Sequence, residues 1–482
     1  MKGFTRYLKP LEILTEEQVE AIHRGTLEVL ETTGLRIEHE RALKVFEKNG
    51  CKVDYDEMRV RFPPGLIEEC LYKAPNSFRV RARDPKNDLM MGGNTLYFGP
   101  SPGMGIVDLD TWEMRTATRQ EFYDGVTVLD ALETVHYQVS YTPYFGFEGI
   151  PPVMCLPEVT AGKIRNSTKF MSTGTAMGSE VFQIEMAKAV GMEIMSNTLL
   201  ASPPLTYCHD AVEAAFRVME AGFPLFTVSG GIFGGTAPAT IAGATITGNA
   251  EAIAGIALAQ LVKPGMRVMA SHFAFPQNMR SGSPAFGNIG CFLHTVVFNQ
   301  MWRKYQIPTF NFAVGLSNSK EIDFQNGYER AIPALLSALS GANVITLHGG
   351  VHGELTHHPI QAILDDDIAG MIGRFIEGVE VNEETLALDL IDEVGPIPGF
   401  YLNTEHTRKW WKREQFLSKT SDRLTYPEWR EQGKKNTLNY ARERMEEILA
   451  THKPTPLTPR QEADISNILE EARSYYRQKG LI

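Results

Sequence analysis

The first ninety residues carry apolar side chains at the spacing of amphipathic helices. One such stripe consists of Val19, Ile22, Leu27 and Leu30. Thr15 and Gln18 precede it with the spacing of a capping box, which satisfies free amides at a helix N-terminus. Further helices are predicted over residues 39–49 and from Pro63 onward. We therefore expect an N-terminal helical region over residues 1–92.

In the middle of the chain the pattern changes, and short apolar runs alternate with segments of helical spacing. The runs cover residues 96–99, 135–141, 169–175, 205–210, 225–231, 267–273, 309–315 and 344–350. The segments 181–195 and 251–262 are typical of the helices between them. Strands that alternate with helices favour parallel βα units, and eight units favour a closed barrel. We expect an α/β fold of the TIM (β/α)8 type over residues 93–400. The first run could instead pair with residues 105–110 as an antiparallel hairpin.

Beyond residue 400 the pattern becomes charged and rich in tryptophan. Residues 440–449 and 460–479 have helical spacing, and the proline-rich stretch 453–459 between them is typical of an extended linker. We expect residues 401–482 to form a C-terminal helical extension that packs on the barrel or on a second subunit.

Composition narrows the functional classes. Lys+Arg 47 against Asp+Glu 58 gives a net charge of −11, which argues against nonspecific nucleic-acid binding. The sequence shows no uninterrupted apolar run of about 20 residues and no signal peptide, so we expect no membrane span and a cytoplasmic location. Its cysteines, at positions 51, 70, 155, 208 and 291, form no C-x-x-C pair, which is typical of reduced thiols.

Barrel enzymes place their function at the C-terminal ends of the strands, and several runs here end in polar or small residues. His348 ends one run and is followed by Gly349 and Gly350, which would let a ligand approach the backbone. The other strand-end candidates are His209, Asn311, Gly230 and Gly231. A lone strand-end histidine is as often a structural hydrogen-bonding residue as a ligand contact.

Aromatic residues also gather near the predicted strand ends. Tyr97, Tyr141 and Phe273 are the candidates for a cage, with few fixed charges beside them in the sequence. Aromatic rings attract weakly hydrated cations such as quaternary ammonium groups through the negative faces of their π systems. A single strand-end ring is more often simple packing, so the prediction depends on several rings meeting.

Two other kinds of site, for a metal ion and for a dinucleotide, need comparison with the aromatic cage. His352, Glu354 and His357, with Cys208 as a further candidate, suggest a metal-dependent lyase or hydrolase, although their spacing matches no common zinc motif. The stretch G-G-I-F-G-G (230–235) lacks the second glycine of a dinucleotide fingerprint. The run Asp365-Asp366-Asp367 is interpreted as a solvated helix face.

Several segments together resemble the trimethylamine methyltransferase family. They are residues 14–34, 63–75, 81–85 (R-A-R-D-P), 97–111 (Y-F-G-P-S-P-G-M-G-I-V-D-L-D-T), 115–118 and 317–331 (S-N-S-K-E-I-D-F-Q-N-G-Y-E-R-A). The resemblance implies a barrel enzyme that moves a methyl group from a methylated amine to the cob(I)alamin of a partner corrinoid protein. Pyrrolysine, which the archetype carries, is absent here, and its position would fall within 310–350. The chain therefore resembles the non-pyrrolysine branch, which uses quaternary amines.

On this interpretation glycine betaine is the expected substrate and dimethylglycine the product, with proline betaine, carnitine or another methylated amine as alternatives. Tyr97, Tyr141 and Phe273 would hold the cation, His348 and His209 the carboxylate, and Asn311 either group. Glycines 230, 231, 349 and 350 would let the corrinoid ring approach, and no cofactor would be tightly bound. A non-catalytic betaine-binding protein remains an alternative, and a homodimer is expected.

Overall fold

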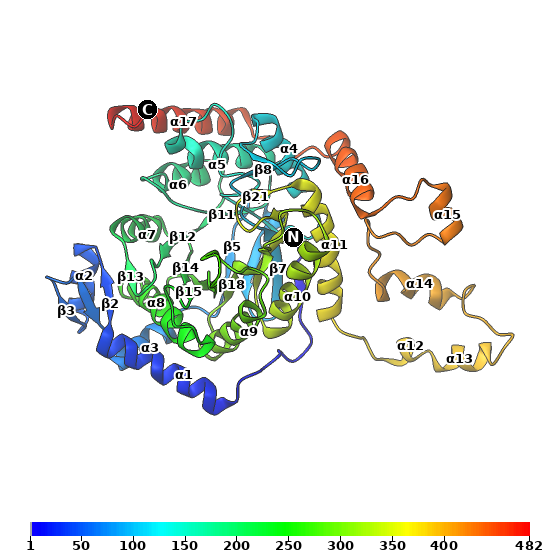
Figure 1. Ribbon diagram of the computed structural model, residues 1–482, viewed down its shortest axis with the longest axis horizontal. Coiled ribbons are helices and arrows are strands. Elements are labelled where there is room, and N and C mark those ends of the chain that lie inside the picture. The colour runs from blue at the N-terminus through cyan, green and yellow to red at the C-terminus, as the bar shows by residue number, and fades with distance from the viewer. Residues whose placement is uncertain (1) are drawn as a thin grey trace.

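The computed structural model describes residues 2–482 and contains a closed barrel of parallel strands (Figure 1). The barrel strands are β7 (Thr95–Pro100), β10 (Tyr137–Val139), β11 (Phe170–Thr173), β12 (Ile194–Leu200), β14 (Leu225–Ser229), β16 (Val268–His272), β18 (Thr309–Asn311) and β19 (Val344–His348). Each pairs in parallel with the next, and β19 pairs with β7. A parallel bridge between Phe98 and Val135 closes the ring. The predicted eight-stranded fold class is confirmed.

A helix follows every barrel strand and covers the outside of the sheet. The helices are α4 (Arg119–Ala131), α5 (Cys155–Asn166), α6 (Glu180–Ala189), α7 (His209–Ala221), α8 (Ile241–Val262), α9 (Ile289–Lys304), α10 (Phe324–Ser340) and α11 (Pro359–Ile376). By length and composition α8 is apolar enough to cross a membrane, yet 72% of its most apolar window is buried inside the protein. Burial against the barrel and the N-terminal region explains its composition without a bilayer.

The fourth barrel strand lies earlier than predicted. Residues 194–200 form this strand, whereas the sequence pattern assigned residues 181–195 to one helix and 205–210 to the strand. In the structure only β13 (Thr206–Tyr207) is extended in the latter run, and it pairs with β2 (Leu35–Ile37) outside the barrel. Helix α6 ends at Ala189, and Gly191, with φ +76°, turns the chain into β12.

The N-terminal region is mixed rather than purely helical. It contains α1 (Glu16–Glu28), α2 (Glu40–Lys48) and α3 (Pro64–Lys73), and α1 begins with the predicted capping box. The antiparallel strands β2, β3 (Lys52–Asp54) and β4 (Arg59–Arg61) lie between the helices. Short strands of three residues carry too little periodicity to be recognised in sequence.

A hairpin closes the N-terminal end of the barrel. Strands β5 (Ser77–Val80) and β6 (Leu89–Gly92) pair antiparallel, and their side chains join the cluster that fills the barrel interior. That cluster includes Phe78, Val80, Leu89, Met91, Tyr97, Tyr137, Phe170, Met195, Phe226, Met269, Phe310 and Val344. Next to the hairpin, β1 (Phe4–Thr5) pairs antiparallel with the start of β7. The barrel is therefore a packed core sealed at this end.

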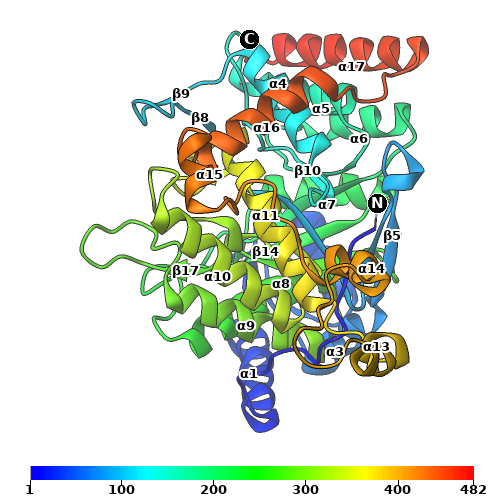
Figure 2. The same ribbon diagram turned by 90° about the vertical axis from the view of Figure 1, so that its right-hand side faces the viewer.

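The C-terminal residues form helices on the outside of the barrel and an arm beside it. Helix α16 (Thr437–Thr451) packs on α11 and α4, and α17 (Pro459–Gln478) packs on α5 and α6. Figure 1 shows the preceding segment standing off the body on extended connections, and Figure 2 shows it from its own side, in front of the barrel. This segment contains α12 (Glu383–Leu386), α13 (Leu388–Val394), α14 (Glu405–Glu414) and α15 (Tyr426–Glu431).

Candidate functional site

The loops at the C-terminal end of the barrel build a small sheet of their own. Strand β8 (Gly105–Val107) follows β7, while β20 (Gly350–Val351) and β21 (Thr356–His357) form a hairpin after β19. Strand β21 pairs with β8, which pairs with β9 (Met114–Arg115). The sheet ties the loops of two neighbouring strands together, so the tip of the β20–β21 hairpin has a fixed position at this end.

Three aromatic residues, here called the rim, lie at the C-terminal end of the barrel, where β10, β16 and β18 end. Tyr141, Phe273 and Phe312 pack on the interior cluster but remain partly exposed, unlike the rings below them. The rings of Phe273 and Phe312 meet edge to face, with centroids 5.5 Å apart. Tyr141 stacks on Phe145 at 5.5 Å. Partly exposed rings that pack on the interior below them suit a flat or cationic ligand.

A polar side chain adjoins this rim. Burial raises the pKa of Tyr141, and a hydrogen bond with the Asn197 side chain lowers it in part. Asn197 lies on β12 and is itself partly exposed. The sequence pattern does not point to Asn197, because it favours a helix over residues 181–195 and a fourth strand over 205–210, beyond the observed 194–200. It also passed over Phe312, which the alternation Phe310, Asn311, Phe312 places on the same face as Phe310.

Tyr97 does not belong to this rim, which corrects one cage assignment. Its ring is 4% exposed and lies in the interior cluster, at the start of β7. The hydroxyl oxygen accepts a hydrogen bond from the Met90 amide of the closing hairpin at 3.0 Å. Tyr97 lies one inward-facing position before Gly99 on β7, near the sealed end of the barrel. Its side chain therefore helps to hold the closing hairpin in place.

His348 is fully buried in the wall of the barrel, not exposed at its mouth. Its Nε2 lies 2.8 Å from Thr134 Oγ1, whose hydroxyl donates to Asp366 at 2.6 Å, and its Nδ1 lies 3.3 Å from the Gly99 carbonyl. Burial lowers the pKa of His348 to about 4. The register of β19 shifts between Thr346 and His348, and such an irregularity turns the next side chain to the outer face.

Gly349 and Gly350 make room for the protein's own side chains. A Cβ at Gly349 would lie 1.9 Å from the His357 ring, and φ is +89° there. A Cβ at Gly350 would lie 2.9 Å from Arg330. The guanidinium of Arg330 donates to the carbonyls of Gly315 and Gly350 and pairs with Asp365. The space beside Gly349 is thus occupied by the His357 ring and the space beside Gly350 by Arg330, so the structure gives no support to a ligand approaching at these glycines.

The clamp joins the last two strand-end loops to α11. Arg330 and Asp365 are both fully buried, with Nη2 and Oδ2 2.6 Å apart. Asp365 also accepts from the Gly349 amide at 2.8 Å and from Gln361 at 2.9 Å. A buried pair in which every guanidinium nitrogen and carboxylate oxygen makes a hydrogen bond fixes geometry, and breaking it leaves an uncompensated charge.

Gly230 and Gly231 are likewise taken up by internal packing. A Cβ at Gly230 would lie 2.8 Å from Ala274, and one at Gly231 would lie 2.6 Å from Thr236 Oγ1. The Gly230 amide donates to the Glu251 carboxylate at 2.9 Å. Burial raises the pKa of Glu251. The predicted role of these two glycines in admitting a corrinoid ring is therefore unsupported.

His209 and Asn311 also lie away from the rim. His209 begins α7, is largely exposed and stacks on His39 of the N-terminal region at 4.9 Å. Asn311 is fully buried, and its Nδ2 lies 3.5 Å from His272, whose ring packs on Phe298 of α9. The structure therefore gives no support to the predicted roles of His209 toward the carboxylate and of Asn311 toward either group.

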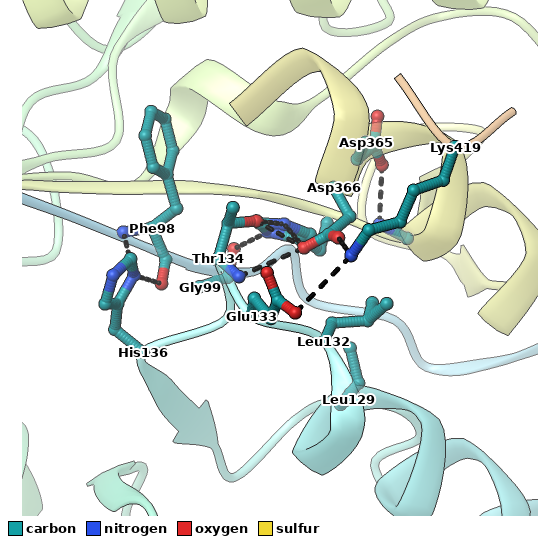
Figure 3. A network of polar contacts seen from close by, with 12 residues as sticks. Phe98, Gly99, Leu129, Leu132, Glu133, Thr134, His136, Asp365, Asp366 and Lys419 are labelled. Carbon is teal, nitrogen blue, oxygen red and sulfur yellow. Dashed lines mark hydrogen bonds and ion pairs between the residues drawn. The ribbon is translucent and has the colours of Figure 1, made fainter. Parts of the chain in front are cut away.

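The acidic run 365–367 is buried, which contradicts its interpretation as a solvated face. Each carboxylate has a separate partner. Asp365 holds the clamp, Asp366 accepts from Thr134, and Asp367 accepts from residues 418–420 of the C-terminal segment. In Figure 3 Lys419 of that segment lies between Asp366 and Glu133, at 3.9 and 3.7 Å. Helix α11 therefore joins the barrel to the C-terminal extension.

The residues of the metal alternative do not assemble. Among residues 2–482 no group of three His, Cys, Asp or Glu side chains is placed to hold a metal ion. The His357 ring is fully buried in a hydrophobic setting against Tyr144, while His352 and Glu354 remain partly exposed on the hairpin. Cys208 lies 3.4 Å from Ser202 in the loop before α7.

Comparison with known proteins places the chain in a family. The family model described as trimethylamine methyltransferase matches residues 1–474, and the chain belongs to this family of methyltransferases. The glycine betaine methyltransferase of Desulfitobacterium hafniense strain Y51 is 32% identical, over 96% of this chain and 98% of that protein. A trimethylamine methyltransferase of the same species, strain DSM 10664 / DCB-2, is 30% identical over 96% and 94%.

Relatives extend to the archaea. The trimethylamine methyltransferase of Methanosarcina thermophila is 29% identical over 93% of this chain and 94% of that protein. Among solved structures, the monomethylamine methyltransferase of Methanosarcina barkeri is 12% identical, covers 96% of this chain and 93% of that chain, and has a TM-score of 0.46. The family resemblance predicted from the sequence is confirmed.

Proposed function

We propose that this methyltransferase transfers a methyl group from a quaternary amine, with glycine betaine as the first choice, to the cob(I)alamin of a corrinoid protein. The observation that carries the proposal is the full-length similarity to a glycine betaine methyltransferase. The partly exposed rim of Tyr141, Phe273 and Phe312 supports it, because such rings bind onium cations without a proton-transfer group.

The chemistry requires positioning more than acid or base catalysis. The electron pair of the broken N–CH₃ bond leaves with nitrogen, and the methyl carbon bonds to cobalt. Glycine betaine then departs as dimethylglycine, a neutral amine at the reacting nitrogen. The protein must hold one methyl group toward the open end of the barrel and keep water away from it. The rim can do this, since its rings are braced by the packed interior.

A substrate panel tests the proposal. Glycine betaine, proline betaine, carnitine, choline and trimethylamine would each be offered to the purified protein with cob(I)alamin, and the cobalt absorbance followed. We expect methylation with glycine betaine. Methylation with another amine alone would correct the substrate, and binding of betaine without methylation would favour a non-catalytic binding protein.

We also propose a homodimer formed through the C-terminal arm. Between residues 377 and 405 the arm exposes many apolar side chains and carries acidic residues but no lysine or arginine. The most exposed are Val379 (78%), Val381 (71%), Ile397 (95%) and Leu402 (81%). An apolar surface of this kind is typical of an interface.

The position of the arm favours a second copy over the corrinoid protein. Helix α11 runs from the mouth to the sealed end, where the Ile376 carbonyl accepts from the Tyr7 amide beside β1. The arm starts there, whereas a methyl acceptor needs the opposite end.

Light scattering should give twice the chain mass of 53.8 kDa for the native protein. Leu402→Glu should give the monomer, and Tyr72→Glu, at a ring 91% exposed on α3, should not. A monomeric native protein would refute the proposal.

A further inference from the structure

Glu354 is a carboxylate at the barrel mouth that has no partner of its own. It lies at the tip of the β20–β21 hairpin and is partly buried. Across residues 2–482 its side chain takes part in no hydrogen bond or ion pair. Burial raises its pKa. A carboxylate that loses water without gaining a donor is costly, so its position calls for a cationic partner.

The neighbours of Glu354 come from both sides of the aromatic rim. On one side the Met104 amide donates to the Glu354 carbonyl at 3.1 Å, and the Gly103 amide donates to the Tyr141 carbonyl at 3.1 Å. One loop thus connects the backbone of Glu354 to that of Tyr141.

The other side leads to Phe273. A Cβ at Gly353 would lie 2.8 Å from the Phe286 ring, which packs on Phe275 at 4.8 Å. Phe275 in turn packs on Phe273 at 5.0 Å. The Gly353 amide also donates to the Ser317 carbonyl at 2.6 Å, which fixes the hairpin tip. Glu354 therefore sits between the loops that present Tyr141 and Phe273.

We propose that Glu354 binds the onium group of the substrate and sets which onium compounds the enzyme prefers. This inference rests on the proposed function. The carboxylate would attract the cation through a partly desolvated path, where charge interactions are stronger than in water. It would also repel a substrate carboxylate held close to the nitrogen. Glu354 is therefore expected to favour cations without a nearby carboxylate and to weaken the preference for glycine betaine.

Isothermal titration of the full-length protein with tetramethylammonium and with glycine betaine tests this role. Glu354→Gln keeps the shape and removes the charge. We expect it to raise the Kd of tetramethylammonium about tenfold, as expected for the loss of one charge–onium contact, and to change the Kd of glycine betaine less. Glu354→Asp should retain part of the affinity. Glu321→Gln, at an exposed carboxylate in the neighbouring strand-end loop, is the control and should change neither Kd.

The outcomes separate this inference from the proposed function. If the native protein methylates cob(I)alamin and Glu354→Gln binds both ligands as well as the native protein does, Glu354 has no binding role and the methyl transfer stands. If the native protein neither binds nor demethylates any quaternary amine, both fail. If Glu354→Gln does not fold, the pH dependence of ligand binding by the native protein tests the inference. Its affinity for tetramethylammonium should fall as the pH is lowered and Glu354 is protonated, and a constant affinity from pH 8 to 4 would overturn the inference.

Discussion

At the sealed end of the barrel the Tyr97 ring lies under the β5–β6 hairpin and accepts a backbone amide, whereas at the open end the Tyr141 ring keeps contact with solvent. Tyr97 lies within β7, Tyr141 lies just after β10, and both pack on the barrel interior. They differ in which end of its strand each one occupies. Ring content alone therefore does not identify a binding site, because the same aromatic side chain is buried at one end and partly exposed at the other.

The largest expected effect concerns the frame that holds the open end. Asp365→Ala should lower the free energy of unfolding by about 3–5 kcal/mol, because it leaves the Arg330 guanidinium buried and unpaired. Chemical denaturation measures this. Asp56→Ala, at an exposed turn, should change the same quantity by less than about 0.5 kcal/mol. Equal losses in the two variants would mean that the clamp does not stabilise the loops.

The sealed end should respond in stability alone. Phe78→Ala removes a buried ring from the closing hairpin and should cost about 3 kcal/mol of unfolding free energy. The Kd of glycine betaine, measured by titration under folding conditions, should stay within about twofold, because the hairpin lies at the opposite end from the rim. A large change in affinity would break the contrast between the two ends.

The open end should respond in affinity. Phe273→Ala should raise the Kd of glycine betaine about tenfold, since a ring face near a cation is worth about 0.5–2 kcal/mol. Its loss of stability should be smaller than that of Phe78→Ala, because Phe273 is already partly exposed. An unchanged Kd, with Phe78→Ala as the paired reference, would remove Phe273 from the site.

His348 should act through folding stability at acidic pH. The imidazole has a pKa near 6.5 in an unfolded chain, and burial lowers it to about 4 in the folded protein. Between these values the unfolded chain binds the proton and the folded protein does not, so stability is lost as the pH falls from about 6.5 to 4. The loss is at most about 1.4 kcal/mol per pH unit for one group.

Comparison of two variants isolates this group, because His136, His294 and His358 also have pKa values lowered by burial. Denaturation curves between pH 7 and 4 should show a shallower decline for His348→Gln than for the native protein. His209→Gln, at the exposed start of α7, serves as the control. Parallel curves for the native protein and His348→Gln would show that His348 does not contribute.

The smallest expected effect distinguishes the two tyrosines directly. Tyr97→Phe removes one hydrogen bond to the Met90 amide and should cost about 1 kcal/mol of stability. It should leave the Kd of glycine betaine unchanged. A weakened affinity in Tyr97→Phe would return Tyr97 to the list of substrate contacts and blur the distinction between the two ends.

Period and spacing predicted seven of the eight barrel strands, because buried parallel strands give short apolar runs whose separation leaves room for one helix each. The position predicted for the remaining one, the fourth barrel strand β12, was wrong. Only a few residues join helix α6 to β12, so their apolar patterns merge in the sequence. For the same reason Asn197, which adjoins the rim, was not found.

The sequence alone determined the fold class, the family and the presence of aromatic residues near strand ends. Only the tertiary structure decided which of them face the open end. A register shift in β19 turns His348 outward, and the buried Arg330–Asp365 pair claims Gly349 and Gly350. Local sequence patterns predict which residues are apolar enough to be buried. The side chains that contact them come from distant parts of the chain, so their contacts and their exposure depend on the closed barrel.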